Sequence, residues 1–221
     1  MKNILTIIIG CGFFINIFCQ PVAAFNPDHI KRLLATNKCR GCNLRDADLK
    51  GADLKGADLR GADLENVFIS MANLANANLA NVNFRGGRGS KANFSSAVLS
   101  GADFHDANLA ESNFSAADLS GADLSIAYLE KADFQRANLT GCNLKKTNLR
   151  MANLQHAILN QADLQEASLR SAELTGVQLI GATMQEAYMW NTKMDDATRE
   201  YAQNNGAVFK KKAPVKECCD D

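Results

Sequence analysis

A large apolar residue recurs at every fifth position from Leu44 to Met194. Of these 31 central positions, 21 are Leu, five are Phe, three are Met and one is Ile, and only Gly89 departs from the pattern. A small residue, Ala in 22 cases, stands two places before each central residue, and Asp or Asn usually lies between the two. The chain is therefore an array of five-residue units of the form Ala-Asp/Asn-Leu-x-x.

A period of five fits neither regular secondary structure. On an α-helix each step of five residues turns by about 500°, so the central residues would spiral around the surface. On an extended strand an odd step sends successive central residues to opposite faces. A common core forms if the chain turns by about a quarter of a revolution per unit, so that four units close one coil. Phe94, Phe114 and Phe134 are spaced by 20 residues, as are Phe84 and Phe104, so we expect two ladders of rings on opposite sides of the core.

The units resemble those of the pentapeptide repeat family, most clearly in the run Ala47-Asp48-Leu49, Ala52-Asp53-Leu54, Ala57-Asp58-Leu59. The resemblance implies an all-β solenoid: a right-handed quadrilateral β-helix with the leucine and the small residue inside. Here it would have nearly eight coils over residues 42–194. Such a rod exposes an apolar core and an unpaired edge at each end, so we expect caps.

Both flanks of the repeats predict short capping helices. Asn26 can cap a helix that has Pro27 at its first position, within residues 25–41. Asp195 and Asp196 can begin a second helix, with Gly206 as its stop, within residues 195–208. Residues 209–221 lack an apolar period and are predicted to be a disordered tail. The family resemblance also implies either a homodimer formed through a terminal cap or a monomer.

The first 24 residues are predicted to be a secretory signal peptide. Lys2 precedes an apolar stretch over residues 4–18, and small residues lead to a cleavage position after Ala24. The stretch is shorter than the roughly 20 residues of a membrane-spanning helix. An uncleaved anchor and a lipoprotein modified at Cys11 are the alternatives. We expect an exported protein, in the periplasm, a lumen or the extracellular space, with no membrane contact after cleavage.

Export permits disulfides, and Cys39 and Cys42 lie where the first repeat begins. We interpret them as a structural disulfide that braces the N-terminal cap, and exported or lumenal family members resemble this order of helix, Cys-x-x-Cys and repeats. A redox-active pair would need a strand-to-helix context, and a zinc site would need a second pair of ligands at proper spacing. Cys142 occupies an Ala position and is expected to be buried. The adjacent Cys218 and Cys219 could link to another chain.

The charges cancel over the whole chain, with 24 basic and 24 acidic residues. This balance argues against a nucleic-acid-binding protein. It also argues against a DNA mimic that binds topoisomerases, a function that the family resemblance brings in and that needs a strongly negative surface. The charges are banded along the sequence: residues 66–102 contain three bases and no acid, whereas residues 92–130 contain six acids and no base. Solubility alone, or the steering of a partner, would account for such bands.

One unit is degenerate, because glycine occupies both interior positions of the stretch Arg85-Gly86-Gly87-Arg88-Gly89-Ser90-Lys91. We expect this stretch to bulge from the coil, either as a solvated corner or as a contact site for a protein partner through Arg85, Arg88 and Lys91. The three histidines lie far apart in sequence, and a core filled with Leu and Ala leaves no pocket. We therefore expect no enzyme activity, cofactor or metal. The prediction is an exported, non-catalytic scaffold for an unidentified protein partner.

Overall fold

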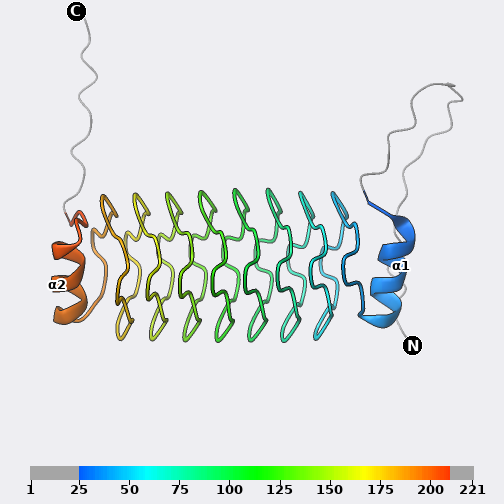
Figure 1. Ribbon diagram of the computed structural model, residues 1–221, viewed down its shortest axis with the longest axis horizontal. Helices are drawn as coiled ribbons and strands as arrows, with labels where there is room; N and C mark the ends of the chain where they lie inside the picture. Colours follow the sequence, from blue (N-terminus) through cyan, green and yellow to red (C-terminus); the bar gives the residue numbers. More distant parts are fainter. Residues whose placement is uncertain (1–24, 210–221) are drawn as a thin grey trace, which may run out of the picture.

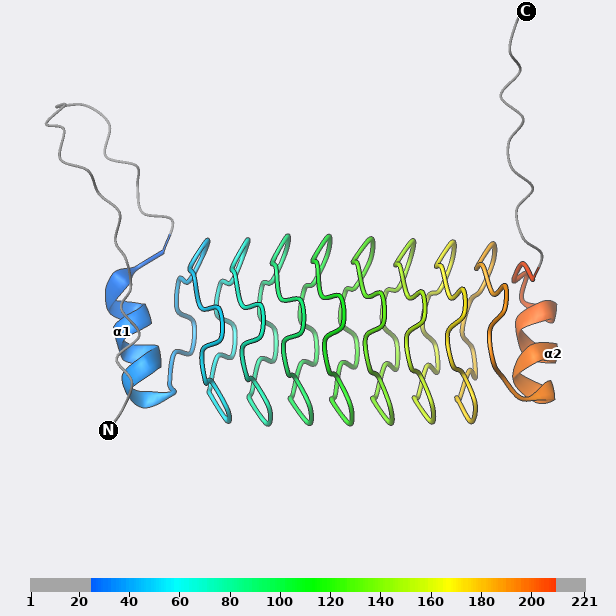
Figure 2. The ribbon, with the colours of Figure 1, turned by 180° about the vertical axis from the view of Figure 1, so that it is seen from behind.

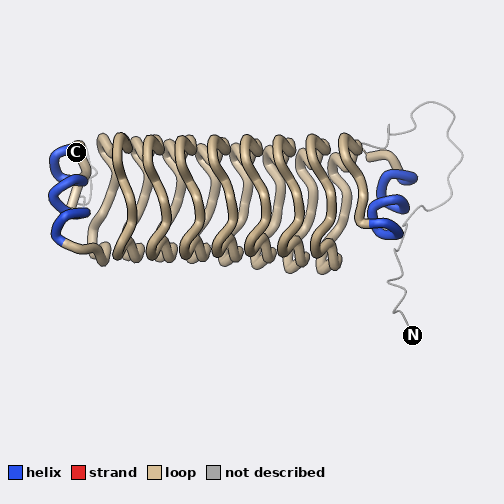
Figure 3. The backbone as a smooth tube through the Cα atoms, turned by 60° about the horizontal axis from the view of Figure 1, so that its bottom comes forward, coloured by secondary structure: helices blue, strands red, loops and turns tan. Residues whose placement is uncertain are grey.

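The computed structural model describes residues 25–209, and the predicted signal peptide and residues 210–221 of the predicted tail lie outside this range. The described chain is a straight rod of stacked coils with one helix across each end (Figure 1). The same stack is seen from behind in Figure 2. Helix α1 spans Pro27–Thr36 and helix α2 spans Asp196–Asn204. The described residues between them form only isolated β-bridges and turns, so each side of a coil is too short to be a strand (Figure 3).

Parallel bridges join residues that are 20 places apart. They run from Lys38 with Asp58 to Glu173 with Lys193, and Tyr188 pairs with Val208 in the same way. Units four apart therefore lie above one another, as the 20-residue period predicts. We call the four resulting columns faces 1 to 4. Each face contains one of the following central residues and those at 20-residue steps from it: Leu44 for face 1, Leu49 for face 2, Leu54 for face 3 and Leu59 for face 4.

A tight turn follows each central residue and brings the chain to the next face. In the first unit the amide of Ala47 donates to the carbonyl oxygen of Leu44 at 3.1 Å, and Asp46 between them has a φ of 56°. The same left-handed position holds Gly in several units and other residues in the rest. Ile126, with a φ of 61°, is the β-branched case, and this conformation is strained for such a side chain.

The Asp or Asn before each central residue stabilises the turn that follows. Its side-chain oxygen accepts a hydrogen bond from the backbone amide two residues later, as Asp118 does from Ser120 at 3.1 Å and Asn73 does from Ala75 at 3.2 Å. Short polar side chains favour this local bond, which satisfies an amide at the start of the turn. The Asp/Asn preference of the repeat therefore follows from turn chemistry.

The central residues and the small residues fill the interior of the rod. The two predicted phenylalanine ladders are confirmed: Phe94 stacks on Phe114 with ring centres 4.8 Å apart, and Phe114 stacks on Phe134 at 5.0 Å. Phe84 and Phe104 form the second ladder at 5.1 Å. Edge-to-face contacts of 6.1–6.4 Å connect the ladders across the core. Offset-stacked and edge-to-face pairs are both favourable arrangements of aromatic rings.

Polar residues at the small interior position bond to the neighbouring coil. The hydroxyl group of Thr147 donates to the carbonyl oxygen of Leu124 at 2.7 Å, and that of Thr192 donates to Leu169 at 2.9 Å. Ser112 donates in the same way to the carbonyl oxygen of Gly89 at 2.8 Å. A buried hydroxyl group is tolerated here because its hydrogen bond is made.

The expectation that residues 85–91 bulge is wrong. The amide of Gly89 donates to Asn108 at 2.8 Å and that of Arg88 donates to Val67 at 2.8 Å, as in a regular coil. The ladder uses backbone groups, so the loss of two side chains does not break it. The Phe84 ring occupies the space where a Cβ atom of Gly87 would lie, so this unit stays packed.

The helices cap the rod as predicted. The side chain of Asn26 accepts from the amide of Asp28 at 3.0 Å, and Pro27 begins α1. Asp195 accepts from Thr198 at 2.8 Å and so caps α2. Hydrogen bonds that Asp195 accepts, first from Thr198 and then from the amide of Gly176, hold the pKa of its carboxyl group below the usual value. Phe209, which the sequence places in the tail, instead packs against the core, with the Arg199 guanidinium group 5.6 Å from its ring centre.

The packing of Phe84 against Gly87 leads to a testable prediction. We expect Gly87→Ala to lower the free energy of unfolding by about 1–3 kcal/mol, because the added methyl group overlaps the ring. The double variant Phe84→Leu/Gly87→Ala restores the usual residues of the repeat and should lose less than the sum of its two single variants. Urea denaturation of the four proteins measures this coupling. Strict additivity of the two single effects would contradict it.

Candidate functional site

The predicted contact residues Arg85, Arg88 and Lys91 lie on one coil but on two faces. Arg85 is on face 1, where its Nη1 lies 3.1 Å from Asp103 Oδ2. Arg88 and Lys91 are on face 2, and the Lys91 Nζ lies 3.6 Å from the carboxylate of Glu111. Arg85 and Arg88 flank the corner between the two faces. The three cations therefore do not converge on a single point.

The four faces differ in charge, which the banding along the sequence did not reveal. Face 1 carries an excess of acid, with nine outward carboxylates against four cations. The carboxylates are Asp46, Asp63, Glu65, Asp103, Asp106, Asp123, Asp163, Glu166 and Glu186, and the cations are Arg45, Arg85, Lys145 and Lys146. Face 2 carries the reverse, with six cations against three carboxylates. The cations are Lys50, Arg88, Lys91, Lys131, Arg150 and Arg170, and the carboxylates are Asp48, Glu111 and Glu130.

Five of the nine carboxylates of face 1 form ion pairs with the four cations of that face. Lys145 lies 3.0 Å from Asp163, Lys146 lies 3.6 Å from Glu166, and Arg45 bonds to both Asp63 and Glu65. Exposed pairs of this kind add little stability, but they lower the negative potential of the surface.

Aromatic side chains gather on face 2, and the sequence analysis missed this feature. The Phe68 ring lies between Lys50 Nζ at 5.1 Å and the guanidinium group of Arg88 at 5.2 Å from its centre. Arg170 lies over Trp190 at 5.4 Å. Cations at these distances are attracted to the ring faces. Reading every twentieth residue from Phe68 onward would have revealed the column.

The structure brings Cys39 and Cys42 together as the expected disulfide, with an S–S distance of 2.08 Å. Both residues are buried where α1 meets the first coil. The Nη2 atom of Arg32 lies 2.6 Å from Cys42 Sγ, and the carbonyl oxygen of His29 lies 3.2 Å from Cys39 Sγ. Thiol–disulfide exchange requires access to a sulfur atom, so this burial favours a structural bond.

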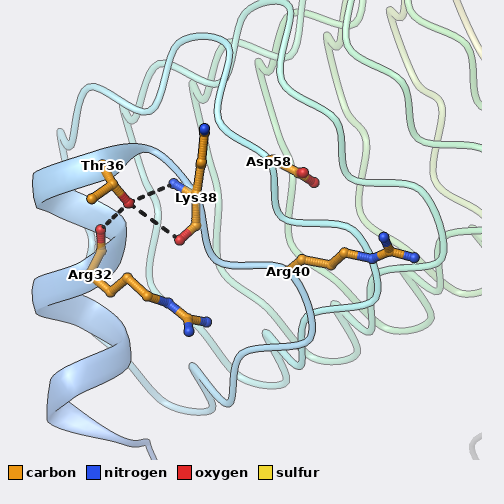
Figure 4. A pocket seen from close by; sticks show the side chains of 5 residues that line it. All are labelled: Arg32, Thr36, Lys38, Arg40 and Asp58. Carbon is orange, nitrogen blue, oxygen red and sulfur yellow. Dashed lines mark hydrogen bonds between the residues drawn. The ribbon is translucent and has the colours of Figure 1, made fainter.

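A hollow of about 600 Å³ lies beside this bond, lined by Arg32, Thr36, Lys38, Arg40 and Asp58. Its three cationic groups point in different directions (Figure 4). The Thr36 hydroxyl group is engaged with backbone, donating to Arg32 at 2.8 Å. Bonds from Arg60 lower the pKa of Asp58 to about 2. The cations of this open hollow could attract an anion. Because their charged groups do not converge, they form no site that would hold one.

Two neighbouring coils on face 1 place a serine, a histidine and a carboxylate in contact. Ser125 Oγ donates to Asp123 at 2.6 Å and lies 2.9 Å from His105 Nδ1. The hydroxyl proton is directed to the carboxylate, so the histidine is not placed to remove it, as the base of a catalytic triad must be. The arrangement is a polar ladder on the surface.

Residues 25–209 offer neither a cluster of metal ligands nor a helix that could span a membrane. No group of three or more His, Cys, Asp and Glu residues in this range could hold a metal ion. Neither α1 nor α2, the two helices of this range, is long and apolar enough to cross a membrane.

Two sequence models of protein families match the repeats, and each is named by its description. The description "Pentapeptide repeat region" matches residues 37–114. The description "Pentapeptide repeats (8 copies)" matches residues 127–161, 147–185 and 162–198. No curated protein matches the chain.

Solved structures of pentapeptide repeat proteins are similar to the chain. A trypsin-treated form of QnrB1, a plasmid-mediated fluoroquinolone resistance protein, is 17% identical over 78% of this chain and 96% of that chain, with a TM-score of 0.51. At this identity the likeness extends to the fold alone. HetL, involved in heterocyst differentiation regulation in Nostoc sp. strain PCC 7120, is 24% identical over 74% of this chain and 92% of that chain, with a TM-score of 0.36. A second Nostoc PCC 7120 repeat protein is 34% identical over 49% of this chain and 84% of that chain, with a TM-score of 0.34.

The position of the disulfide predicts a local effect on stability. We expect Cys39→Ser/Cys42→Ser to lower stability by roughly 2 kcal/mol, because the unfolded chain gains freedom. Faster amide hydrogen exchange in residues 27–43, with unchanged protection in the central coils, is the expected signature. Cys142→Ser serves as the control, since it replaces a buried thiol without breaking a covalent bond. Unaltered exchange in α1 of the double variant would refute the bracing role.

Cys142, the free cysteine among the described residues, should be inert in the native protein. It is buried, its thiol donates to the carbonyl oxygen of Leu119 at 2.9 Å, and burial raises its pKa from 9.0 to about 12. With Cys218→Ser and Cys219→Ser in place, iodoacetamide at pH 8 should alkylate Cys142 only in urea. The thiol of the unfolded chain ionises at a lower pH than the buried thiol of the folded protein. Raising the pH above about 9 therefore lowers the free energy of unfolding. Rapid alkylation of the folded protein would contradict this account.

Proposed function

The chain belongs to the pentapeptide repeat family, and on that basis we propose that it is an exported, non-catalytic scaffold that binds a protein partner along its sides. The observation that carries the proposal is the filled interior, where stacked Phe, Leu and Ala side chains occupy the axis of the rod. Small-molecule sites need a concave space, so the outer faces are what this fold can offer to a partner. We expect the rod to wind in the right-handed sense, with nearly eight coils, as the family does.

The faces suit a binding role because they are rigid and differ from one another. Backbone hydrogen bonds of 2.7–3.1 Å run between successive coils over most of the rod. A backbone held in this way loses little freedom when a partner binds. Face 1 offers carboxylates and face 2 offers cations and rings, so a partner could be both selected and oriented. Our candidate contact residues are Arg85 and Arg88, which flank the corner where these two surfaces meet, and Lys91, which lies at the opposite edge of face 2.

A DNA-mimicking role has one observation in its favour, the carboxylates of face 1. We give it second place, because five of the nine carboxylates form ion pairs within the face and the chain has no net negative charge. A mimic of duplex DNA needs a dense, unpaired row of negative charge. Tight binding of the protein to a type II topoisomerase would favour this alternative over the scaffold.

The export part of the proposal depends on residues 1–24, which precede the described residues. The buried disulfide is consistent with an oxidising compartment, where such bonds form and persist. Sequencing the N-terminus of the protein from its native cells tests this point. A first residue at Phe25 is expected, and a retained Met1 would refute cleavage.

Site-specific photo-crosslinking in the native compartment tests the scaffold role. Four equivalent positions follow one another around a single coil, one on each face: Ser90 on face 2, Ser95 on face 3, Ser100 on face 4 and His105 on face 1. We expect a photoreactive residue to capture a discrete protein partner from one or two adjacent faces, because partners that bind a rod approach from one side. The other faces are the matched controls. Crosslinks only between copies of the chain would indicate a self-assembling rod, and no crosslinks from any face would refute binding along the sides.

A further inference from the structure

We propose that face 2 is the docking surface of this protein and that its occupant is an acidic segment of a partner protein. The inference rests on the proposed scaffold role and makes it specific to one face and one kind of partner. The outward residues of face 2 that carry the argument are Phe68, Arg88, Tyr128, Arg150 and Arg170.

The first step is the position of the bulky residues within the repeat. Phe68, Arg88 and Tyr128 stand immediately before a central residue, where Asp or Asn normally accepts the amide two residues later. Neither aromatic ring nor guanidinium can accept that bond. The substitutions therefore forgo a favourable turn interaction at three levels of the same column. Face 4 also departs from the pattern, at Val98, Ile158 and Gln178, but there the substitutions bring neither a ring nor a cation.

The second step is the apolar surface that these residues create. Eight large hydrophobic residues are notably exposed in residues 25–209, and four of them lie on face 2: Met71, Tyr128, Met151 and Trp190. Tyr128 has 42% of its surface exposed and Met71 has 66%. At the edge of this face, Ile126 keeps a β-branched side chain at a φ of 61°, where Gly would be free of strain. Tyr, Trp and Arg are the residues that most often carry binding energy at protein interfaces.

The third step is charge. All three carboxylates of face 2 are engaged within the face: Asp48 with Lys50 at 3.6 Å, Glu111 with Lys91 at 3.6 Å, and Glu130 with the Tyr128 hydroxyl at 2.7 Å. Among residues 25–209, Arg88, Lys131, Arg150 and Arg170 form no ion pair with a carboxylate, although Glu130 attracts Lys131 and Arg150 from a longer distance. Arg88 and Arg170 lie over rings, which fixes their guanidinium groups without neutralising them. Carboxylates of a partner are the groups that would complement them.

The fourth step separates a protein from other anionic partners. A single-stranded nucleic acid stacks its bases on open ring faces, but Lys50 and Arg88 already lie over the Phe68 ring. An anionic membrane favours apolar side chains that can insert, whereas these rings lie among charged groups. Carboxylates between the cations also weaken attraction to a continuous row of phosphates. Discrete carboxylates on a protein segment fit the spacing of cations and rings better.

Variants that restore the repeat provide the test. In Arg88→Asn/Tyr128→Asn each position receives the residue that the repeat favours, so the melting temperature should stay equal or rise as the turn bonds return. The control Arg136→Asn/Val98→Asn removes one cation and one exposed apolar residue from faces 3 and 4. The probe is a random 4:1 copolymer of Glu and Tyr, which is titrated into the ¹⁵N-labelled protein at low salt. Binding is measured from the changes in the amide chemical shifts of the protein. The lysine–tyrosine copolymer, phosphatidylglycerol vesicles and a duplex DNA of 20 base pairs are titrated in parallel.

We expect the acidic copolymer to shift the amides of residues 68–70, 88–90 and 128–130 most, and to bind the repeat-restoring variant at least tenfold more weakly. The control variant should bind within about twofold of the unmodified protein. Shifts spread evenly over the four faces, equal losses in both variants, or tighter binding of vesicles or DNA to face 2 would each overturn the inference. Crosslinking of a partner only from faces 3 or 4 would overturn it while leaving the scaffold role intact. Crosslinks only between copies would overturn the scaffold role itself.

Discussion

Parallel pairing between successive coils, at positions 20 residues apart, is the constraint on which the whole rod depends. The amide of Leu44 reaches the carbonyl oxygen of Asp63, and the amide of Asp63 reaches back to Cys42, so both backbone groups are satisfied between coils. A coil of 19 or 21 residues would move every later side chain out of its column. This explains why the five-residue frame never slips over 31 units. It also explains why the capping helices, which need no register, are confined to the ends.

Most of the fold could be predicted because the period alone determines which side chains share a column. The stacking of Phe94 on Phe114 required only their separation of 20 residues and a closed coil. The helix starts followed from Asn26 and Asp195, whose side chains act locally. The bulge expected at Gly89 does not form, because the order of a coil does not depend on side-chain volume at every inward position. The backbone ladder holds that unit, and a Phe ring from the preceding unit occupies the space beside Gly87.

The candidate site was harder to predict because neighbours in sequence are not neighbours on a face. Arg85 and Arg88 belong to one basic band of the sequence, yet Arg85 pairs with Asp103 on face 1 and Arg88 lies over Phe68 on face 2. Charges summed along the chain average over all four faces and so hide the difference between them. The contact between Phe68 and Lys50 joins residues from successive coils, which only the closed 20-residue coil brings together.

A rod of this kind separates stability from recognition more completely than a globular domain does. The two inward positions of each unit supply the core. In two of the three outward positions the side chain faces solvent and makes no bond that the turn requires, although the second of these positions must adopt a left-handed backbone conformation. The remaining outward position, the one before the central residue, has a duty to the turn. A bulky side chain there weakens one turn on one level, because each coil contacts only its neighbours. That local cost is small enough to be tolerated, and so the departures at Phe68, Arg88 and Tyr128 point to the surface rather than to the fold.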